Sequence, residues 1–212
     1  MLKAGFARLD VTPPLGTFVP GAGLKRYSEK VLDPIYLNAL AIDLDGERVI
    51  FVAADFLSIN MQYSEELRTV ISERTGVPAD HILIHATHSH TAPAIIDPSK
   101  PPTMAQEFTS VKPDIELEYY TFVRRKLVDA AQFALADLKD AKMGWGIGQA
   151  PRVAFVRRFR MKDGSVRTNP GVDNPDIVAP IGDVDERVNV LRFDQENGES
   201  FVLVNFGDHP DT

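Results

Sequence analysis

The sequence predicts an α/β protein with a layered fold, in which a mixed β-sheet is flanked by helices. Three observations predict this fold class. Short apolar runs that end at turn signals recur along the chain, as they do in strands. Two longer segments carry apolar residues at helical spacing. Strands and helices alternate in the first half of the chain, and strands dominate the second half.

The first elements are strands. Residues 6–11 alternate apolar and polar side chains and predict a half-buried strand. Residues 39–44 and 49–54 predict two further strands, because the Asp-Gly pair between them favours a hairpin turn. The stretch 16–32 is rich in glycine and has little periodicity, so it predicts an ordered loop.

Two helices follow, separated by a strand. Ser64 is suited to cap a helix that ends at Gly76. Residues 81–85 predict a short buried strand, and residues 117–138 have the clearest helical spacing in the chain. Residues 97–114 contain several prolines and no clear period, so they predict a loop.

The second half of the chain predicts mostly strands. Asp163 and Gly164 favour a hairpin turn, and the three prolines and two glycines of residues 168–183 predict a long irregular loop. We expect the 212 residues to form a single α/β domain. The predicted strands are residues 143–147, 152–155, 159–161, 165–167, 188–193 and 201–206.

The composition argues against several classes of protein. Hydrophobic residues make up 44% of the chain and charged residues 25%, as in globular proteins, which disfavours a disordered, collagen-like or coiled-coil chain. The formal net charge of -7 disfavours contact with phosphate backbones, so no nucleic-acid partner is expected. The chain has no cysteine, so any metal would be held by His, Asp, Glu or Tyr.

The two ends of the chain carry expectations of their own. There is no apolar signal core and no run of about 18 apolar residues, so we expect a cytoplasmic protein without a transmembrane segment, or a secreted one if a leader was removed. The sequence stops at Thr212, just after an apolar strand has entered a turn, which is typical of a fragment. Strand edges left by such a truncation would favour a homo-oligomer.

Histidines at strand ends are the first candidates for chemistry. His88 and His90 follow the predicted strand 81–85, and in an extended segment their side chains would point the same way. Two imidazoles at a strand end are suited to form half of a metal site. The alternative, histidines that hydrogen-bond to loop backbone, stays open. It also stays open for His209, which follows the strand 201–206.

Other polar residues near strand ends have more than one interpretation. A structural role is favoured for His81 and His85, which lie on the strand itself. Asp55 ends an apolar strand and is suited to bind metal, to orient a ligating histidine, or to cap the following turn. Arg157 and its neighbouring arginines precede a hairpin, and they could meet a carboxylate, a phosphate or an oxyanion, or simply be solvated.

Five segments match one family in order along the chain. They are residues 6–16 (FARLDVTPPLG), 33–36 (DPIY), 52–55 (VAAD), 87–93 (THSHTAP) and 205–210 (NFGDHP). Together they resemble the opening A-R-x-D-I-T-P-P-x-G, D-P-L-Y, strand-ending Asp, T-H-T-H-S-G-P and N-F-x-x-H-P elements of the neutral/alkaline non-lysosomal ceramidases. Thr91 and Ala92 stand where the family has Ser-Gly. The resemblance spans nearly the whole chain as the N-terminal part of a ceramidase-like catalytic domain.

The resemblance implies a zinc-dependent amidase that acts on a small N-acyl, ceramide-like lipid, and so a role in sphingolipid metabolism. His88 and His209 take the positions of two Zn2+ ligands, and His90 that of a residue contacting the substrate or the developing oxyanion. Arg157 is the nearest match to an arginine that lines the substrate site, although Val156 stands where the family often has Asn. The family's remaining Glu and Tyr ligands and its serine motif would lie beyond residue 212.

Two other kinds of function remain open at this point. An amidohydrolase barrel also has a His-x-His motif, but after its first strand, whereas here at least three predicted strands precede it. A metal-free binding or scaffold domain, or an inert fragment of an enzyme, would contain the same residues without catalysis. A chelator distinguishes a metal-dependent hydrolase from a scaffold, because a scaffold should not respond to it.

Overall fold

The computed structural model describes residues 1–21, 26–95, 97 and 113–209. The elements follow one another as strands, a helix, a strand, a second helix and a final series of strands. They are β1 (Leu2–Asp10), β2 (Tyr36–Leu44), β3 (Glu47–Ala54), α1 (Met61–Thr75), the short 3-10 helix η1 (Ala79–His81), β4 (Ile82–Ala86), α2 (Pro113–Ala136), β5 (Lys139–Gln149), β6 (Arg158–Met161), β7 (Val166–Thr168), β8 (Ile177–Pro180), β9 (Arg187–Gln195) and β10 (Ser200–Phe206).

Seven strands form one mixed sheet in the order β10-β9-β5-β1-β2-β3-β4, which confirms the predicted fold class. Strands β1, β2 and β3 are antiparallel neighbours, and the turn between β2 and β3 contains Asp45 and Gly46, as predicted. Helix α1 carries the chain across to β4, which lies parallel to β3. In the described part of the chain, this open order is not the closed parallel barrel of an amidohydrolase.

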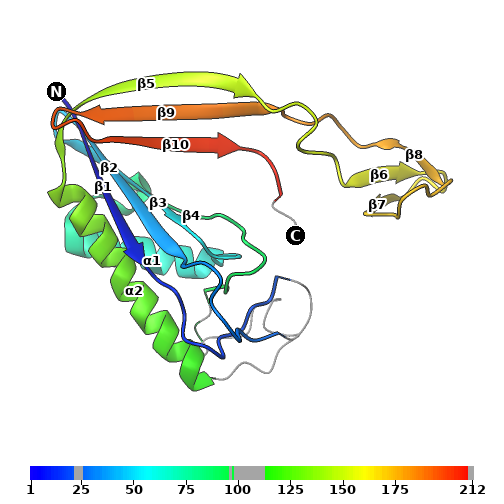
Figure 1. The fold of residues 1–212 in the computed structure, drawn as a ribbon, viewed down its shortest axis with the longest axis horizontal. Coiled ribbons are helices and arrows are strands. Elements are labelled where there is room, and N and C mark those ends of the chain that lie inside the picture. The colour runs from blue at the N-terminus through cyan, green and yellow to red at the C-terminus, as the bar shows by residue number, and fades with distance from the viewer. Residues whose placement is uncertain (22–25, 96, 98–112, 210–212) are drawn as a thin grey trace. The chain divides into compact units, whose positions relative to one another are not determined.

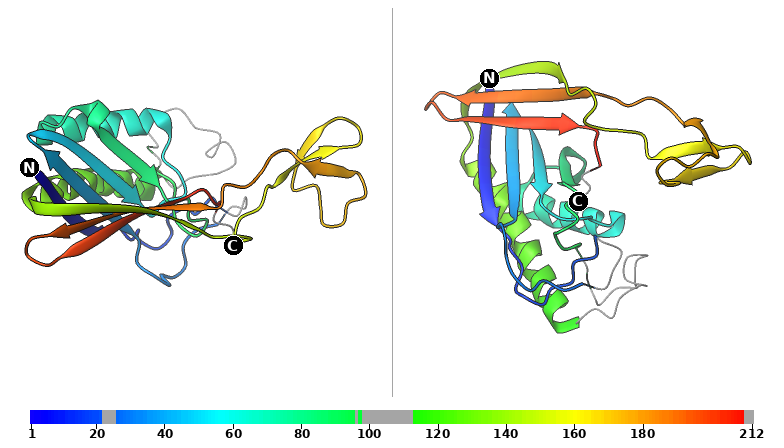
Figure 2. Two further views of the ribbon diagram at one scale, coloured as in Figure 1. Left: turned by 90° about the horizontal axis from the view of Figure 1, so that it is seen from above. Right: turned by 45° about the vertical axis from the view of Figure 1, so that its right-hand side comes forward.

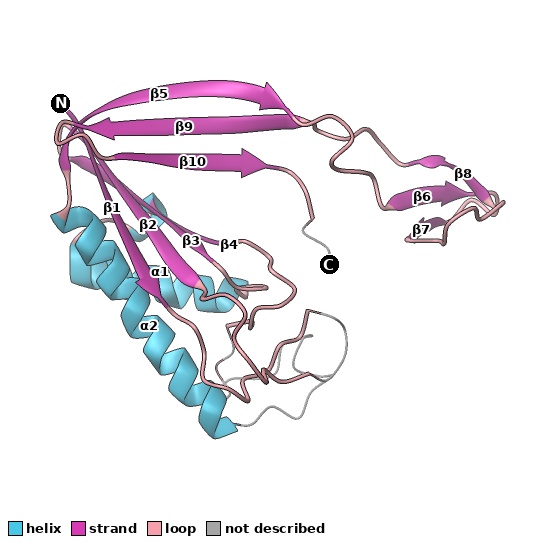
Figure 3. Ribbon diagram, in the orientation of Figure 1, coloured by secondary structure: helices cyan, strands magenta, loops and turns pink. Residues whose placement is uncertain are grey.

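The described chain forms two compact units. The first contains Met1–Lys142 and Phe193–Phe201, and the second contains Met143–Arg192 and Val202–His209. The first unit therefore holds β1–β4 with both long helices. The second holds the separate three-stranded sheet, in which β6 lies between β7 and β8 (Figure 3).

The core of the first unit lies between the sheet and the two helices. Helix α2 packs across β1 and β2, and α1 packs beside α2 and against β4 (Figures 1 and 2). Alternate strand residues point into this layer because successive side chains of a strand face opposite ways. The buried residues of β2, β3, α1 and α2 include Leu37, Ala39, Ala41, Ile50, Val52, Ala54, Tyr63, Leu67, Ile71, Val123 and Leu127.

Gly5 sets how closely α2 packs on the sheet. A Cβ atom at this position would lie 2.1 Å from the backbone carbonyl oxygen of Ala134 in α2. Only a residue without a side chain fits there. Ala130, Ala131 and Ala134 are fully buried, so small side chains on the helix accompany the glycine on the strand.

Helix α1 begins earlier than predicted. Its cap is Asn60, whose side-chain oxygen accepts a hydrogen bond from the backbone N–H of Gln62 at 2.8 Å, and Ser64 lies inside the helix. The additional residues at the start of the helix include Tyr63, which is buried in the core. The charged residues that follow Ser64 gave no indication of this earlier start. The helix ends at Gly76 with a φ of 75°, as predicted.

Helix α2 confirms the predicted helix 117–138 and starts earlier, at Pro113, where a proline is favourable in the first turn. The predicted loop 97–114 lies largely outside the described residues.

Strand β4 is less buried than predicted. The sequence predicted a buried strand, but β4 lies at the edge of the sheet and its Leu83 side chain is 54% exposed. None of the helices in the described residues is long and apolar enough to cross a membrane.

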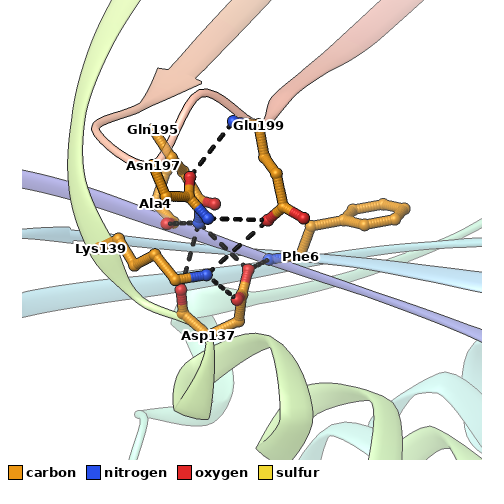
Figure 4. A network of polar contacts seen from close by, with 7 residues as sticks. All are labelled: Ala4, Phe6, Asp137, Lys139, Gln195, Asn197 and Glu199. Atoms are coloured by element: carbon orange, nitrogen blue, oxygen red, sulfur yellow. Dashed lines mark hydrogen bonds and ion pairs between the residues drawn. The ribbon is translucent and has the colours of Figure 1, made fainter.

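A polar network ties the turn after β9 to β1 and to the end of α2 (Figure 4). The Asp137 carboxylate accepts hydrogen bonds from the Phe6 backbone N–H (3.0 Å) and the Gln195 amide (3.1 Å), and it pairs with Lys139 (2.5 Å). The Gln195 amide also donates to the carbonyl oxygen of Ala4 at 2.7 Å. Burial opposes ionisation of Asp137, but these donors outweigh burial and lower the pKa of the carboxyl group.

In the second unit one predicted hairpin is confirmed, and two segments differ from their predicted structure. Strands β6 and β7 form the hairpin that turns at Asp163 and Gly164. Residues 152–155, predicted as a strand, form a turn and irregular backbone, and Arg152 has a positive φ of 64°. The predicted loop 168–183 contains β8, which pairs with β6. This pairing supplies backbone partners that no local sequence pattern encodes.

Candidate metal and catalytic site

The carboxyl ends of β3 and β4 support the histidine loop, which we define as residues 87–93. Because β3 and β4 are parallel neighbours, the segments that follow them leave the same edge of the sheet. The backbone N–H groups of Thr87 and His88 donate to the carbonyl oxygens of Ala54 and Phe56, at 2.9 and 3.0 Å. The first two residues of the histidine loop are therefore bonded to the end of β3 and to the segment that follows it.

Asp55 strengthens this attachment. Its carboxylate accepts a hydrogen bond from the backbone N–H of Tyr36 at 3.0 Å and one from the hydroxyl group of Thr87 at 3.4 Å. Of the interpretations that the sequence left open for Asp55, these contacts favour a residue that bonds the adjoining turn. Asp55 thus joins the start of β2 to the residue that precedes His88.

His88 is fixed in both its backbone and its side chain. It has a φ of 64°, a conformation that residues other than glycine seldom adopt. Its ring atom Nδ1 lies 2.7 Å from the carbonyl oxygen of Leu57. A carbonyl oxygen only accepts hydrogen bonds, so Nδ1 is the donor, and in the neutral ring Nε2 then carries the lone pair that a metal ion requires. Metal-ligating histidines are commonly oriented by such a carbonyl.

His90 lies directly beside His88. The two ring centroids are 4.9 Å apart, and the ring planes are inclined by 85°. The sequence predicted adjacent side chains from an extended segment, but the structure brings the rings together through a turn. His88 is in the left-handed region, and the backbone N–H of Ala92 donates to the carbonyl oxygen of Ser89 at 3.3 Å.

The other two histidines of this region have the surroundings of structural residues. The ring Nδ1 of His81 lies 3.1 Å from the carbonyl oxygen of Arg48, at the start of β4. His85 is exposed on β4, opposite Ala53 of β3. The structural role favoured for both from the sequence fits these positions.

A second segment, which we call the clamp loop, comprises the described residues 16–21 and 26–28. Its two halves are antiparallel: Gly16 N–H donates to the carbonyl oxygen of Ser28 (2.8 Å), and Val19 N–H donates to that of Arg26 (2.9 Å). Phe18 and Tyr27 form a bridge between the halves. The ordered loop predicted over 16–32 is confirmed for these residues.

The clamp loop contacts the backbone of His90. Nη2 of Arg26 donates to the carbonyl oxygen of His90 at 3.1 Å. A Cβ atom on Gly21 would lie 2.2 Å from the same oxygen, so the backbones of the two residues pack directly. From the sequence both residues are only parts of the loop predicted over 16–32, because no spacing rule relates Arg26 to a position 64 residues away.

The clamp loop is in turn anchored on α2. The backbone N–H of Phe18 donates to Oε1 of Glu116 at 2.9 Å, and Glu116 is only 1% exposed. Burial raises the pKa of the Glu116 carboxyl group, and the hydrogen bond from Phe18 opposes this rise. The ring of Phe18 is buried in a small cluster with Ala94, which follows the histidine loop.

A cleft of about 610 Å³ adjoins the histidine loop. Its lining includes Thr87, Ser89 and Thr91 from that loop, together with Arg26 and Asp55. Residues that alternate with the two histidines therefore face the cleft, and the imidazoles are not part of its lining. The cleft lies beside the histidine loop and does not enclose the two rings.

The remaining predicted site residues belong to the second unit. Arg157 is half-buried directly before β6, and its carbonyl oxygen accepts a hydrogen bond from Asn169 N–H at 2.8 Å. His209 follows the end of β10, as the sequence predicted. Among the described residues, His88 and His90 of the first unit and His209 of the second each offer one ring nitrogen that could hold a metal ion.

Two solved ceramidase structures share the fold of this chain. One is the neutral ceramidase from Pseudomonas aeruginosa, with a TM-score of 0.68 and 19% identity, covering 98% of this chain and 32% of that one. The other is a ceramidase complexed with C2, with a TM-score of 0.64 and 17% identity, covering 94% of this chain and 30% of that one. No protein-family model and no curated protein matches the chain in sequence. The chain thus spans about a third of the length of these two ceramidases and shares the fold of that part.

Proposed function

We propose that this chain is the metal-binding part of a zinc-dependent hydrolase that cleaves the amide bond of an N-acyl, ceramide-like substrate. The observation that carries the proposal is the state of His88, whose Nδ1 is bound to a backbone carbonyl so that Nε2 is the metal donor. The fold shared with two ceramidases supports a hydrolase. The amide substrate follows from the resemblance of the sequence motifs.

The chemistry of the available donors suits zinc. A chain without cysteine offers imidazole and carboxylate ligands, and imidazole is well matched to zinc. We assign His88 and His209 as zinc ligands, and the motif resemblance places further ligands beyond residue 212. Zinc, when bound, supplies Lewis acidity toward water and toward an amide carbonyl.

We assign His90 and Arg157 to stabilise the negative charge that develops on the substrate during the reaction. When water attacks an amide carbonyl carbon, negative charge develops on the carbonyl oxygen. The imidazole of His90, beside the metal ligand His88, is suited to donate a hydrogen bond to this oxygen. The guanidinium group of Arg157 adds positive charge. The C–N bond then breaks as the nitrogen takes a proton, which gives a carboxylic acid and an amine.

The first test is the zinc content of the purified protein and of the variants His88→Asn and His209→Ala, measured by elemental analysis. Asparagine tolerates the left-handed backbone of residue 88, so that variant removes the imidazole without forcing the loop to rearrange. His81→Ala is the matched control, because the His81 ring contacts Arg48 at the other end of β4. We expect near-stoichiometric zinc in the wild type and the control. The site variants should retain much less zinc, because loss of a ligand should weaken zinc affinity by at least about tenfold.

Two outcomes would contradict the proposal. Zinc retained by both site variants would show that the ligands are wrongly assigned. If zinc is bound as expected, release of amine from N-acyl substrates should be lost on chelation and in His88→Asn. Bound zinc without any such turnover, in a protein that includes the remaining ligands, would favour a metal-binding scaffold over a hydrolase.

A further inference from the structure

We infer that the clamp loop positions His90 for its role, with Arg26 and Gly21 as the positioning residues. The inference deepens the proposed function and rests on it, because it concerns how the residue beside the metal ligand His88 is held. Neither residue belongs to the motifs that suggested the function. Both contact the backbone of His90 and not its imidazole.

The first contact is a charge-assisted hydrogen bond. Nη2 of Arg26 donates to the carbonyl oxygen of His90 at 3.1 Å. The guanidinium group is a charged donor whose N–H groups are held in a rigid, planar fork. Hydrogen bonds from a charged donor are roughly twice as strong as neutral ones. Arg26 therefore restrains the peptide group that follows the His90 side chain.

The second contact is steric. A Cβ atom on Gly21 would lie 2.2 Å from the carbonyl oxygen of His90 and 2.5 Å from its Cα atom. Both atoms are backbone and cannot turn aside as a flexible side chain could. Any residue larger than glycine at position 21 must therefore displace either the clamp loop or His90. The same peptide group is thus bonded by Arg26 and packed by Gly21.

The clamp loop is well supported for this role. Thr17 and Phe18 are 0% and 1% exposed, and Phe18 is bonded to the buried Glu116 of α2. The cluster of Phe18 and Ala94 attaches the loop just beyond the histidine loop as well. A functional side chain is held accurately only when the groups behind it are themselves fixed. The anchors on α2 meet this requirement.

The orientation of the two imidazoles depends on these restraints. The His88 ring is fixed by Leu57, and the His90 ring meets it nearly edge-on with 4.9 Å between centroids. Since the carbonyl of His90 is held by Arg26, a release of that contact lets the His90 ring move relative to the fixed His88 ring. Arg26 and Gly21 thus act on the site through His90 without touching substrate.

The test compares Arg26→Ala, Arg26→Lys and Gly21→Ala with the wild type. Arg125→Ala is the control, because Arg125 is exposed on α2 in a different region of the chain. One readout is the NMR resonance of the His90 ring in metal-free protein, with the His81 ring as an internal reference. The other is the zinc dissociation constant, measured by competition with a chelator.

We expect the His90 resonance to shift in Arg26→Ala and Gly21→Ala while the His81 resonance stays in place. The zinc dissociation constant should stay close to the wild-type value in both variants, because Arg26 and Gly21 contact His90 and not the assigned zinc ligands His88 and His209. Arg26→Lys should shift the His90 resonance less than Arg26→Ala does, because an ammonium group can donate to the same carbonyl. Arg125→Ala should match the wild type in both readouts.

An unchanged His90 resonance in Arg26→Ala and Gly21→Ala would overturn the inference. Equal shifts of the His81 and His90 resonances would overturn it too, because they would show a general loss of structure. The NMR readout needs neither metal nor turnover. A wild-type protein that binds no zinc would therefore contradict the proposed function, while the His90 resonances would still decide whether the clamp loop positions this residue.

Discussion

The two units of the chain are stabilised in different ways. In the first unit, buried aliphatic and aromatic side chains fill the layer between the sheet and the helices. Within the described residues of the second unit, Met161 is the one buried apolar side chain, while Trp145 is 73% and Val172 94% exposed. The second unit is ordered mainly by backbone pairing, as in the hairpin that turns at Gly164.

This difference separates the candidate site residues into two groups. The backbone of His88 is bonded to the segment that follows β3, and the backbone of His90 is bonded to the clamp loop. Both supports contain buried side chains, Phe56 and Phe18, so burial of apolar area supports their geometry. Arg157 and His209 belong to the unit in which few side chains are buried. Substitutions should therefore cost much more stability in the first unit than in the second, and three matched pairs of variants test this.

The largest contrast is expected between two glycines. Gly5→Ala would place a Cβ atom 2.1 Å from the Ala134 backbone, so it should cost more than about 4 kcal/mol of unfolding free energy or prevent folding. Gly146→Ala in β5 meets nothing within 4 Å and should change stability by no more than about 0.5 kcal/mol. Urea denaturation followed by circular dichroism measures both. Near-equal effects would show that helix α2 does not depend on a glycine in β1.

A smaller contrast is expected between two apolar side chains. Leu127 is fully buried in α2, so Leu127→Ala should leave a cavity and cost about 3 kcal/mol. Val178 in β8 is 62% exposed, and Val178→Ala should cost no more than about 0.5 kcal/mol. The same urea titration gives both values. An equal loss from Val178→Ala would reveal that this side chain is covered in solution.

The smallest contrast concerns two carboxylates. Asp137→Asn should lower the unfolding free energy by about 1 kcal/mol at neutral pH, because it removes the charge that Lys139 and two N–H donors stabilise. The exposed Asp176, whose carboxylate lies 3.9 Å from Lys162 in the second unit, is the control, and Asp176→Asn should have no measurable effect.

The pH dependence checks the cause of this effect. The pKa of Asp137 is lowered in the folded state, so the stability from its carboxylate is present above the unfolded pKa of about 3.9. It is lost as the pH falls through the lower folded pKa. Urea titrations over a series of acidic pH values should show wild type and Asp137→Asn converging in that range. A difference that persists unchanged would mean that the loss comes from geometry and not from charge.

Local sequence patterns predict the structure where the interacting residues are close along the chain. The Asp-Gly turn between β2 and β3, the end of α1 at Gly76 and the inward face of α2 follow from such patterns. These patterns do not predict the structure where a distant partner decides it. Residues 177–180 became β8 because β6 was available to pair with them. Leu83 is exposed on β4 because successive side chains of a strand face opposite ways, and Ile82 is the one that is buried.

The candidate site divides in the same way. The absence of cysteine and the His-x-His spacing indicated candidate imidazole ligands at the end of a strand, and metal binding by them stays a prediction. They could not predict which ring nitrogen of His88 carries its proton, since Leu57 decides that from the segment after β3. Nor could they identify Asp55 as the residue that bonds Thr87, next to His88.

The sequence by itself determined the fold class and most of the strands and helices. These depend on side-chain alternation, helical spacing and turn chemistry, which act over a few residues. Only the tertiary structure decided the packing of Gly5 against α2 and the contacts of Arg26 and Gly21 with His90. Such contacts form between residues far apart in the chain, and they exist only after the sheet, the helices and the loops have packed together.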